Sequence, residues 1–576
     1  MPQFEALIRT PFAGPWRRFT RPSALFTARR ADAVRACLDD AEAAARAGSY
    51  VVGFVCYEAA AAFGLPAQAA SDALLPLCCF AAFPADQVDR LDAITASGEP
   101  VSGWTPSIDR GRYLDAIRRI KALIADGDTY QLNFTFRLRA PFAGDAGRLF
   151  GDLVAAQQGP WSAFIDLGSA AICSASPELF FTLEDGRLEC RPMKGTAPRG
   201  LSSSADRAAA DALHQSAKNR SENVMIVDLV RNDLGRVAVT GSVDVRSLFD
   251  VEQYPQQWQM TSTIAADAGE ASIADIFAAL FPSGSVTGAP KHRSMEILGT
   301  LEDSPRGIYT GAIGLIAPGG RAHFNVAIRT VVIDRSAARA EFGVGSGVVW
   351  ESSDRDEYEE CRVKAAILTK RLPPFDLLET LAWTPGRGYV LLERHLARLG
   401  ASAGYFGWAY DPDEVRASLA SAVAARTTPA RVRLLVDSAG RSRCETADLP
   451  PCVPRWTAAL AAVPIDVDDV LLYHKTTQRE TYTTARASRP DADTVLLWNG
   501  RGEVTESPEA NLIAEFAGRR VTPPVESGLL PGTLRAELLA AKLVSEERIL
   551  SGDLPRAERL WLVNSVRGWI PVDLMK

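Results

Sequence analysis

Two adjacent prolines divide the chain into two parts with different sequence patterns. A helical stretch ends at Arg371-Leu372-Pro373-Pro374, and a strand pattern starts at Phe375-Asp376-Leu377-Leu378-Glu379-Thr380. With a prior of roughly 150 residues per domain, a chain of 576 residues contains several domains or two large ones. The break at the prolines therefore predicts one domain over residues 1–372 and a second over residues 375–576.

Composition narrows the class of protein. Hydrophobic residues make up 47% of the chain and charged residues 23%, as in an ordinary soluble globular protein. The net charge of −7 lacks the basic signature of nucleic-acid binding, so Lys and Arg must gather locally to bind an anion. The nine cysteines show neither metal-ligand spacing nor a disulfide framework, which indicates a reducing, cytoplasmic setting. The most apolar stretch, residues 50–70, contains Glu58, Gly64 and Pro66 and predicts a strand and a short helix rather than a membrane span.

Lys194 and Glu222 are the first candidates for chemistry. Lys194 lies in Pro192-Met193-Lys194-Gly195-Thr196, where a glycine turn lets backbone approach a ligand. A lysine whose pKa is lowered by burial or by another cation can act as a nucleophile. Glu222 opens the apolar run of residues 224–230 and points inward on a helix, where a carboxylate needs a partner, often a metal ion. The alternative for both is a surface turn followed by a core helix.

Two more polar residues stand at the ends of predicted strands. Ser176-Pro177-Glu178-Leu179 joins two strands, and the proline fixes a turn that presents Glu178 toward a cavity. Tyr309 opens one strand pattern, and Arg329 follows the apolar run of an adjacent one, where a buried arginine needs an anionic partner. A solvated turn carboxylate and a structural salt bridge are the respective alternatives.

Two glycine-rich segments favour backbone binding of an anion. Residues 281–291 precede a helix at residues 292–298, and their amides, with the helix N-terminus, suit an anion near Thr287. Gly343-Val344-Gly345-Ser346-Gly347 is either a plain hairpin or a second backbone site.

An acidic helix is predicted at residues 356–364. Glu357 and Glu360 are three residues apart and Lys364 is four beyond Glu360, so all three share one face. Such a face is usually just solvated.

In this order the motifs resemble those of the chorismate-utilising enzymes, which include anthranilate synthase, isochorismate synthase and aminodeoxychorismate synthase component I. The resemblance covers most of residues 1–372 and implies a two-layered α/β sandwich, so the expected fold class is α/β (α+β). Anthranilate-forming members usually carry Ala in the turn of Lys194, and aminodeoxychorismate synthase carries Lys. The resemblance implies that Lys194 attacks the substrate ring covalently before ammonia enters, with Glu178 as general acid or base beside the departing hydroxyl.

The same resemblance implies the ligands of the first part. Glu222 and Glu360 bind Mg²⁺ directly, with Glu357 nearby through water, and the ion neutralises and orients the ring carboxylate. The implied chorismate-binding residues are Thr287, Tyr309, Arg329, Gly345, Ser346, Gly347 and Lys364.

Two glutamines bear on the reaction. Isochorismate-forming relatives place a Lys base where Gln131 stands, so Gln131 argues against a hydroxylating reaction. Relatives commonly carry His in a His-Leu-Val-Ser segment that aligns with Gln259-Met260-Thr261-Ser262. Because glutamine cannot titrate, Gln259 puts any proton-transfer role of that histidine in doubt.

The second part carries its own ordered motifs. Lys475 stands at the expected end of an apolar strand, Leu471-Leu472-Tyr473-His474, where an edge lysine is the usual case. Glu506 lies five residues before Asn511 in a Thr-Glu-x-x-x-x-Asn pattern. Leu530-Pro531-Gly532-Thr533 begins a helix whose amides suit a phosphate.

With Arg398 in a His-x-x-Arg-Leu helix and Ser565 in a late turn, these motifs resemble the fold-type IV pyridoxal-phosphate enzymes over about residues 375–576. That family includes branched-chain aminotransferases, D-amino-acid transaminases and aminodeoxychorismate lyase. The resemblance implies a two-subdomain α+β domain that dimerises. It also implies pyridoxal 5′-phosphate bonded to Lys475, a pyridine nitrogen paired with Glu506, and a phosphate held by Arg398, Thr533 and Ser565.

Together the two resemblances imply a bifunctional enzyme. The first part converts chorismate and ammonia to 4-amino-4-deoxychorismate, and the second eliminates pyruvate to give 4-aminobenzoate, the folate precursor. In the second step Lys475 takes the proton alpha to nitrogen and helps return it to the ring system. None of the five histidines lies in a glutaminase motif, so a separate glutamine amidotransferase subunit is expected to supply ammonia.

Two alternatives stay open. One is an anthranilate synthase joined to an amino-acid transaminase, against which Lys194 argues. The other is a ligand-binding or regulatory protein with one dead site, against which the set of charged candidates in both parts argues.

Overall fold

The structure is a computed structural model that describes residues 4–9, 16–67, 74–96, 100–369, 371–451 and 454–575. Its contacts divide the chain into two compact units, Met1–Pro198 with Ala210–Arg371, and Arg199–Ala209 with Leu372–Lys576. One division falls between Arg371 and Leu372, just before the paired prolines. The grouping of Arg199–Ala209 with the second unit was not anticipated from the sequence. No helix of the described residues is long and apolar enough to cross a membrane.

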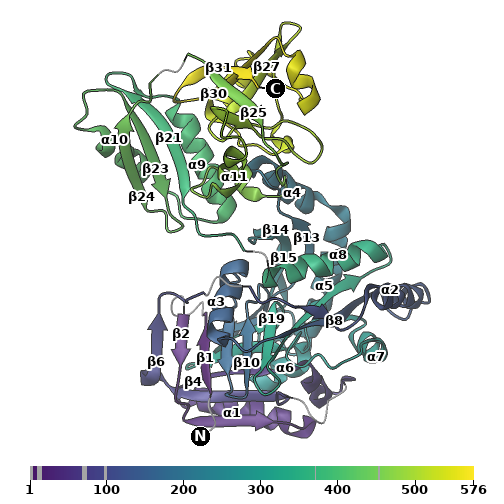
Figure 1. Ribbon diagram of the computed structural model, residues 1–576. Coiled ribbons are helices and arrows are strands. Elements are labelled where there is room, and N and C mark those ends of the chain that lie inside the picture. The colour runs from purple at the N-terminus through teal and green to yellow at the C-terminus, as the bar shows by residue number, and fades with distance from the viewer. Residues whose placement is uncertain are drawn as a thin grey trace. The chain divides into compact units, whose positions relative to one another are not determined.

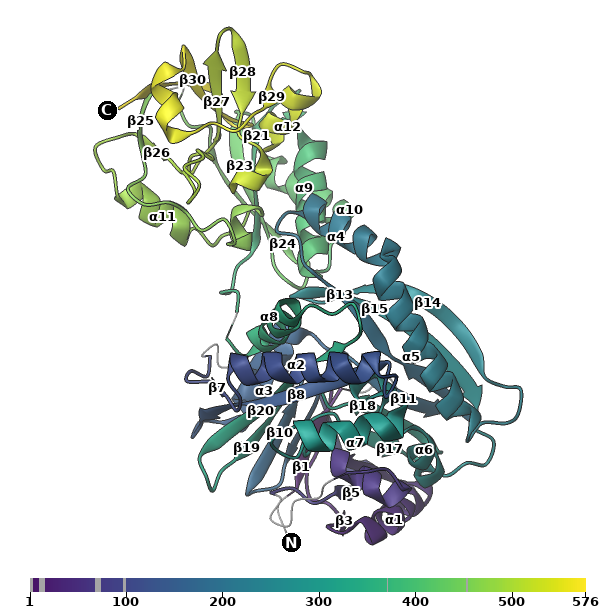
Figure 2. The ribbon, with the colours of Figure 1, turned by 90° about the vertical axis from the view of Figure 1, so that its right-hand side faces the viewer.

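Two ten-stranded sheets form the first unit (Figures 1 and 2). The first sheet runs in the spatial order β16 (Gly288–Ala289), β8 (Gln131–Pro141), β20 (Arg339–Val348), β19 (Thr330–Asp334), β10 (Ala170–Ser174), β9 (Ala163–Asp166), β1 (Glu5–Ile8), β2 (Trp16–Phe19) and β6 (Val88–Leu91), with β7 (Thr105–Pro106) on β8. The second runs β13 (Met193–Pro198), β15 (Gln257–Asp267), β12 (Arg187–Arg191), β11 (Leu179–Glu184), β18 (Arg321–Val326), β17 (Ala312–Ala317), β4 (Ser49–Val55), β5 (Cys78–Pro84) and β3 (Ala24–Ala28), with β14 (Asp244–Gln253) on β15.

The sheets pack face to face because their central strands are apolar on both sides. In β4, Val52 and Phe54 belong to the core between the sheets, whereas Val51 and Val55 belong to the core beneath the helices. Successive side chains of a strand point to opposite faces, so a continuous apolar run is buried on both. The apolar stretch at residues 50–70 forms β4 and the short 3-10 helix Tyr57–Phe63, and its last three residues lie outside the described ranges.

Helices cover the outer face of each sheet. On the second sheet lie α1 (Val34–Arg46), α5 (Ala217–Gly235) and α6 (Ile273–Leu280), and on the first lie α2 (Arg110–Ala125), α3 (Ala146–Gln157) and α8 (Asp354–Ala365). Two further helices are α4 (Ser203–Gln215) and α7 (Lys291–Leu301), and the remaining 3-10 helices are Ala31–Ala33, Ala85–Gln87, Gly284–Val286 and Ala366–Leu368. The helices predicted at residues 108–125, 292–298 and 356–364 are confirmed as α2, α7 and α8.

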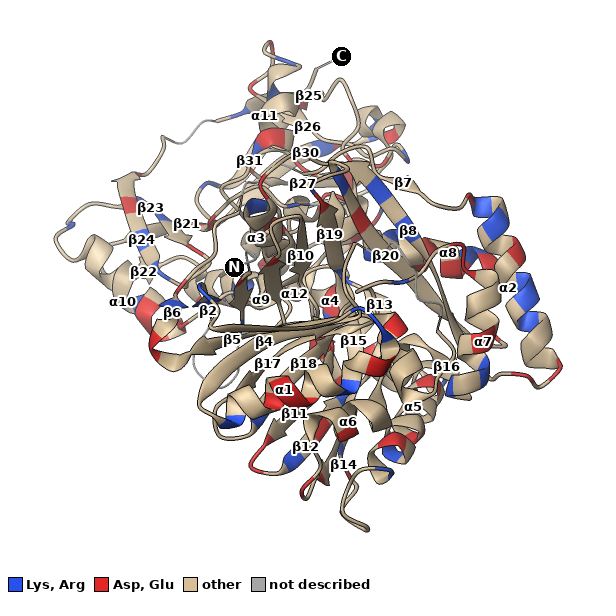
Figure 3. Ribbon diagram, turned by 90° about the horizontal axis from the view of Figure 1, so that it is seen from below, with Lys and Arg blue, Asp and Glu red and all other residues tan. Residues whose placement is uncertain are grey.

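Charge placement explains where α8 begins and ends. Ser353 caps its N-terminus by accepting a hydrogen bond from the Asp356 amide at 3.3 Å. Acidic residues fill the first turn, and Arg362 and Lys364 occupy the last, as the helix dipole favours. Figure 3 shows red acidic residues along α8, whereas α2 carries both signs.

The turn predicted at Lys194 is wrong, the hairpin alternative for residues 343–347 is excluded, and Arg329 follows its strand as expected but in an unusual conformation. Lys194 lies inside β13 rather than in a turn, and the register of β13 against β15 shifts between Met193 and Thr196. Residues 343–347 lie within β20 rather than in a hairpin. Arg329 lies beyond the end of β18 with a positive φ of 53°, a conformation that non-glycine residues adopt at some cost.

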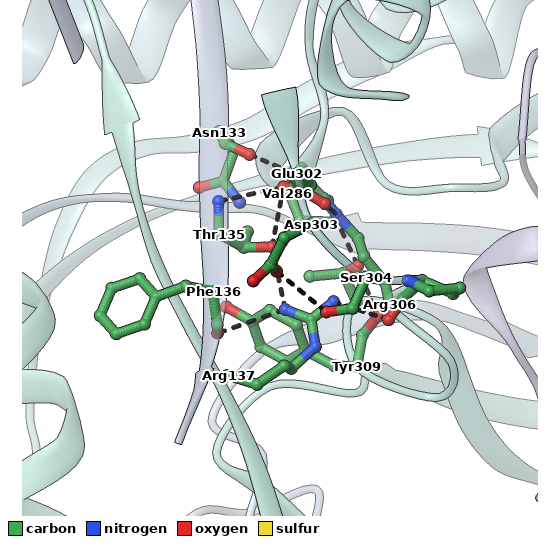
Figure 4. A network of polar contacts seen from close by, with 12 residues as sticks. Asn133, Thr135, Phe136, Arg137, Val286, Glu302, Asp303, Ser304, Arg306 and Tyr309 are labelled. Carbon is green, nitrogen blue, oxygen red and sulfur yellow. Dashed lines mark hydrogen bonds and ion pairs between the residues drawn. The ribbon is translucent and has the colours of Figure 1, made fainter. Parts of the chain in front are cut away.

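A buried ion pair joins three segments of the first unit (Figure 4). Arg306 lies 2.7 Å from Glu302, and both side chains are almost fully buried. The guanidinium also donates to the carbonyls of Val286 at 2.8 Å and Asn133 at 2.7 Å. Glu302 in turn accepts from the amide and hydroxyl of Thr135 at 3.0 and 2.8 Å. The pair thus ties β8 to the loop before Thr287 and to the segment that leads to Tyr309.

The second unit contains a four-stranded and a seven-stranded sheet. The first has the order β22 (Gly388–Tyr389), β21 (Leu377–Thr384), β23 (Ala430–Val436) and β24 (Ser442–Asp448), with α9 (Leu392–Phe406) and α10 (Pro412–Val423) on one face. The second has the order β26 (Thr494–Leu496), β25 (Trp456–Leu460), β31 (Gly568–Leu574), β30 (Arg559–Asn564), β27 (Asn511–Phe516), β28 (Arg519–Thr522) and β29 (Ser545–Glu546). The other helices are α11 (Glu480–Ala487) and α12 (Thr533–Ala540), with 3-10 helices at Val470–Leu472, Val525–Ser527 and Ser551–Arg556.

The segment Arg199–Ala209 is held in the second unit by a buried ion pair. Arg199 lies 2.7 Å from Asp206, and both side chains are 5% exposed. The guanidinium stacks over the ring of Tyr405 at 4.3 Å and donates to its carbonyl at 2.7 Å. His474 contacts the Leu201 carbonyl at 3.2 Å, so this segment packs beside the residue that precedes Lys475.

The Arg306–Glu302 pair generates a stability prediction. Glu302→Gln leaves a buried guanidinium without its counter-charge, so we expect a loss of about 3–5 kcal/mol in the free energy of unfolding of the first unit. Denaturant titration measures it. Glu359→Gln is the control, because its pair with Arg362 is exposed and contributes under about 1 kcal/mol. Equal midpoints for the two variants would contradict the importance of the buried pair.

Candidate active sites

Lys194 is placed by an irregularity in the second sheet. Gly195 has a φ of 95°, which glycine adopts without strain, and the register of β13 breaks at this point. Gln259 on β15 donates a hydrogen bond from Nε2 to the Gly195 carbonyl at 2.9 Å and stabilises the irregular backbone at this point. Gln259 therefore holds the backbone next to Lys194.

The surroundings of Lys194 favour a neutral amine. Burial and the nearby charge of Lys364 lower the pKa of Lys194, while Glu222, Glu178 and Glu360 oppose the shift. The structure thus gathers four other predicted site residues around the Lys194 amine. A lysine with a lowered pKa has a larger fraction of nucleophilic free amine near neutral pH.

Glu178 is buried, and its Ser-Pro-Glu-Leu motif joins β10 to β11, as predicted for two strands. Burial raises the pKa of Glu178 to about 7, although a hydrogen bond from Ser285 and the charge of Lys194 act in the other direction. The Ser285 hydroxyl donates to Oε1 at 2.6 Å. A carboxyl group with this pKa can give and take a proton at neutral pH.

Arg329 faces neutral oxygens. Its guanidinium donates to Gln257 Oε1 at 3.1 Å and to the Lys364 carbonyl. Burial lowers the pKa of Arg329 to about 10. Gln257 Nε2 also donates to Gln259 Oε1 at 3.2 Å, which completes a chain from Arg329 to the Gly195 carbonyl. A carboxylate bound at Arg329 would therefore act on the same hydrogen-bond chain that fixes the backbone beside Lys194.

The glycine-rich residues 343–347 lie in β20. A Cβ on Gly347 would lie 2.9 Å from Lys194 Nζ and 3.0 Å from Gln131 Nε2, so the ends of both side chains lie directly against this glycine. Gly345 accepts a hydrogen bond from Lys364 Nζ at 2.9 Å through its carbonyl. The Ser346 hydroxyl pairs with the Tyr113 hydroxyl at 2.7 Å. Gly347 therefore lies against Lys194 and Gly345 against Lys364, whereas the Ser346 side chain faces Tyr113.

Two other predicted substrate residues are buried within the protein. The Thr287 hydroxyl donates to the Ser283 carbonyl at 3.1 Å, inside its own loop. Tyr309 packs beneath the Arg137 guanidinium, whose carbon lies 5.3 Å from the ring centroid. A Cβ on Gly343 would lie 2.1 Å from the Tyr309 ring, which shows how closely the strand passes over it.

The three carboxylates predicted to hold or flank Mg²⁺ lie close enough for their charges to interact. Burial raises the pKa of Glu222 and of Glu357, and nearby Glu360 raises both further. Burial opposes ionisation of Glu360, but Lys364 at 2.6 Å holds its pKa below the usual value. Glu357 Oε2 is buried without a hydrogen-bond partner, which fits a bound cation. The described residues nevertheless contain no group of three acidic, His or Cys side chains already arranged around one point; Mg²⁺ in proteins commonly completes its shell with water and substrate oxygens.

A cavity of about 350 Å³ in the second unit holds the other candidates. Residues of the strands β21, β23, β25, β27 and β30, of the helices α9, α11 and α12, and of the connecting loops line it. The predicted residues among its walls are Arg398, Lys475, Glu506, Thr533 and Ser565. All five candidates of the second part therefore face one space.

Lys475 does not end a strand, contrary to the prediction. It follows the 3-10 helix Val470–Leu472, and its carbonyl accepts a hydrogen bond from the Leu378 amide of β21 at 2.9 Å. Burial and the charges of Arg398 and Arg479 lower the pKa of Lys475 to about 8. The amine is therefore partly deprotonated at neutral pH.

Both carboxylate oxygens of Glu506 accept hydrogen bonds. Tyr482 donates to Oε1 at 2.8 Å, the Leu530 amide donates to it at 3.1 Å, and Asn511 donates to Oε2 at 3.0 Å. Burial raises the pKa of Glu506 to about 7 despite these bonds. The Asn of the Thr-Glu-x-x-x-x-Asn pattern thus orients the Glu.

The anion end of the cavity contains two residues that the sequence predictions left out. Glu379 on β21 binds Arg398 at 2.6 and 2.8 Å and His395 at 2.6 Å. Burial alone would raise the pKa of Glu379, but Arg398 and His395 lower it to about 2. His395 Nε2 lies 2.9 Å from the Ser565 hydroxyl and 3.3 Å from that of Thr533. The His-x-x-Arg spacing, one helical turn, was the signal that could have revealed His395.

This donor set fits pyridoxal phosphate. Gly532 caps α12 without a side chain, so the first amides of that helix keep no side-chain partner. A Cβ at Gly532 would lie 1.8 Å from Asn511 Oδ1, which excludes larger residues. The hydroxyls of Thr533 and Ser565 both contact His395 Nε2, and Thr533 is the first residue of α12. A helix N-terminus with hydroxyls is a common phosphate site, and Lys475 and Glu506 supply an amine and a carboxylate.

Comparison with protein families agrees with this division. Residues 6–370 match the family described as chorismate binding enzyme, and residues 376–575 match amino-transferase class IV. The chain is 42% identical over 260 residues to aminodeoxychorismate synthase component 1 of Salmonella typhimurium, which covers 45% of this chain and 57% of that protein. It is 40% identical over 260 residues to an anthranilate synthase component 1 of Haloarcula marismortui, covering 45% and 53%. The chain therefore spans little more than half the length of these relatives.

A solved structure shows the same fold in the first part. Anthranilate synthase component I from Streptococcus pneumoniae aligns with a TM-score of 0.53 at 23% identity, covering 64% of this chain and 92% of that one. The predicted fold class is confirmed: a chorismate-utilising fold is followed by a class IV aminotransferase-like domain in a mixed α/β chain.

The role of Gln259 is testable. Gln259→Leu removes the donor to the Gly195 carbonyl, so Lys194 loses its fixed position. We expect kcat for chorismate consumption to fall about 10- to 100-fold, since small misplacements of a reacting group cost this much, with little change in KM. Steady-state kinetics with ammonium measure it, and exposed Gln215→Leu is the control. An unchanged kcat would mean that the hydrogen bond does not position Lys194.

Proposed function

The chain belongs to the chorismate binding enzyme family, and we propose that it makes 4-aminobenzoate in two steps. In the first unit, chorismate and ammonia give 4-amino-4-deoxychorismate and water. In the second, this product is split into 4-aminobenzoate and pyruvate. The observation that carries the proposal is Lys194, a lysine of lowered pKa beside a carboxyl group whose pKa is about 7.

Lys194 and Glu178 divide the first reaction between them. The Lys194 amine adds to the ring while the ring hydroxyl leaves as water with the proton of Glu178. Ammonia then displaces the Lys194 amine from the ring. The new ring ammonium group loses one proton, which returns to Glu178. A nucleophile and an acid that both exchange protons near pH 7 suit this sequence.

The remaining groups of the first site bind and orient chorismate. Arg329 offers a planar guanidinium to a carboxylate. Glu222 and Glu360 would hold Mg²⁺, with Glu357 close by, and the ion would neutralise the ring carboxylate. Lys364 adds a positive charge and keeps the pKa of Lys194 low.

In the second site, this chain positions pyridoxal phosphate and moves one proton. The cofactor, when bound, supplies the electron sink for the elimination. The free amine of Lys475 takes the proton alpha to nitrogen as the enolpyruvyl group leaves the neighbouring ring carbon, and it gives that proton to the leaving group, which becomes pyruvate. Glu506 pairs with the pyridine nitrogen, whose positive charge would stabilise the carboxylate. Thr533, Ser565 and the α12 amides hold the phosphate, and Arg398 adds a cation at that end.

Ammonia is proposed to come from a separate glutamine amidotransferase subunit. The relatives named component 1 are parts of larger assemblies by their names. None of the five histidines of the sequence stands in a glutaminase motif. The purified chain should therefore use ammonium but not glutamine.

The anthranilate alternative is favoured by one observation, the 40% identity to an anthranilate synthase component. Lys194 argues against it. An amino-acid transaminase in the second unit would need a keto-acid acceptor, whereas a lyase releases pyruvate without one.

Two lysine variants test the proposal. Supplied with chorismate, ammonium, Mg²⁺ and pyridoxal phosphate, the wild type should form 4-aminobenzoate and pyruvate in equal amounts. Lys475→Ala removes the amine of the second site, so 4-amino-4-deoxychorismate should accumulate and pyruvate release should fall at least about 100-fold. Lys194→Ala should form 4-aminobenzoate only from added 4-amino-4-deoxychorismate. Chromatography of the products measures the outcome for both variants. Anthranilate as the product of the wild type would overturn the proposal.

The hydrogen bond from Ser285 predicts a pH effect. The bond stabilises the Glu178 carboxylate and so lowers its pKa. Ser285→Ala removes it, and the pKa of Glu178 rises above about 7. The rate depends on protonated Glu178, so it falls as pH rises through the pKa of this group. In Ser285→Ala this falling limb of the pH–rate profile should move to higher pH. The profile of chorismate consumption is measured at a constant concentration of unprotonated ammonia, and a shift to lower pH would contradict the role of Glu178.

A further inference from the structure

One face of the four-stranded sheet points into the cavity of the second unit. In β23, Val432 and Leu434 pack into the core beneath α9 and α10, whereas Arg431 and Arg433 alternate with them and line the cavity. Leu378 and Thr380 of β21 lie on the same face. Two arginines two residues apart therefore stand on the wall opposite the helix side of the sheet.

The two arginines differ in their cross-strand neighbours. Arg433 lies opposite Glu445 of β24, and the two side chains form an ion pair at 3.0 Å. Arg431 lies opposite Ala382 on one side and Ala447 on the other, neither of which can offer an acceptor side chain. Opposed charges on adjacent strands stabilise each other, so the sheet satisfies Arg433 and leaves Arg431 without a counter-charge.

Arg431 makes no hydrogen bond or ion pair with any residue that the structure describes, and its Nε atom is buried. The other arginines of the cavity wall are engaged. Arg398 pairs with Glu379, Arg479 donates to the Pro508 carbonyl, and Arg567 donates to the Pro451 carbonyl at 2.9 Å. A buried guanidinium nitrogen without an acceptor is costly, and the open side of Arg431 is the cavity.

We propose that Arg431 binds a carboxylate of the amine substrate in the second site. The ligand class is an anionic ring-bearing primary amine, and on the proposed function the group bound is the ring carboxylate. That carboxylate is shared by 4-amino-4-deoxychorismate and 4-aminobenzoate and stands across the ring from the amine. Its capture by a planar, bidentate guanidinium fixes the orientation of the amine. Arg431 is thus a specificity-determining residue.

The test compares ligands that differ in charge alone. The holoenzyme is titrated with 4-aminobenzoate and with its neutral isostere 4-aminobenzamide, and the absorbance of bound pyridoxal phosphate reports the second site. The wild type should prefer the carboxylate. Arg431→Met should weaken 4-aminobenzoate about 10- to 100-fold, as for loss of a charged hydrogen-bonding partner, and leave 4-aminobenzamide nearly unchanged. Arg431→Lys should restore part of the preference.

Arg443→Met is the matched control, because Arg443 lies on adjacent β24, pairs with Asp376 at 2.8 Å and does not line the cavity. Its ligand preference should equal that of the wild type. Cofactor absorbance and melting temperature check that each variant is folded and loaded. An Arg431→Met enzyme that keeps the wild-type preference for 4-aminobenzoate would overturn the inference.

The titration measures ligand binding and needs no turnover. Its result therefore tests carboxylate binding at Arg431 separately from the proposed lyase activity. If the wild type releases no pyruvate, the lyase proposal fails. The charge preference and its loss in Arg431→Met would still establish carboxylate binding at Arg431.

Discussion

The first unit depends on the burial of one guanidinium. Arg306 could not be desolvated without Glu302, because an unpaired buried charge costs several kcal/mol. Once paired, its remaining donors reach Val286 and Asn133, which belong to separate segments. Both segments form walls of the first site: one leads to Thr287, and the other lies opposite Gly347 in the register of β8 and β20. The buried Arg306–Glu302 pair therefore helps to position the segments that carry Thr287 and the strand beside Gly347.

The two sites use the same electrostatic arrangement in unrelated folds. Each has a lysine whose pKa is lowered by burial and by neighbouring cations, Lys364 in one case and two arginines in the other. Each also has a carboxyl group, Glu178 or Glu506, whose pKa burial raises to about 7. Opposite shifts from a common cause bring amine and acid toward the same pH. Neither site needs a histidine to exchange protons at neutral pH.

Sequence motifs predicted much of this and missed what depends on strand register. The order of the motifs was enough to bring Lys194, Glu178 and Glu222 into one site, and helices such as α2 and α8 followed from periodicity and charge. The hydrogen bond from Gln259 to the Gly195 carbonyl could not be foreseen, since it requires the register of β13 against β15. The contrast between Arg431 and Arg433 likewise depends on which residues of β21 and β24 lie opposite. Lys475 was misplaced because an apolar run of four residues suits a 3-10 helix as well as a strand.

The central claim is that Lys194 becomes covalently attached to the substrate. The direct measurement mixes the protein with chorismate and Mg²⁺ in the absence of ammonia and determines the mass of the peptide that contains Lys194. The account predicts an increase equal to chorismate less one water, absent in Lys194→Ala and lost when ammonium is added. An unmodified Lys194 peptide in a preparation that makes 4-amino-4-deoxychorismate as soon as ammonium is supplied would contradict it.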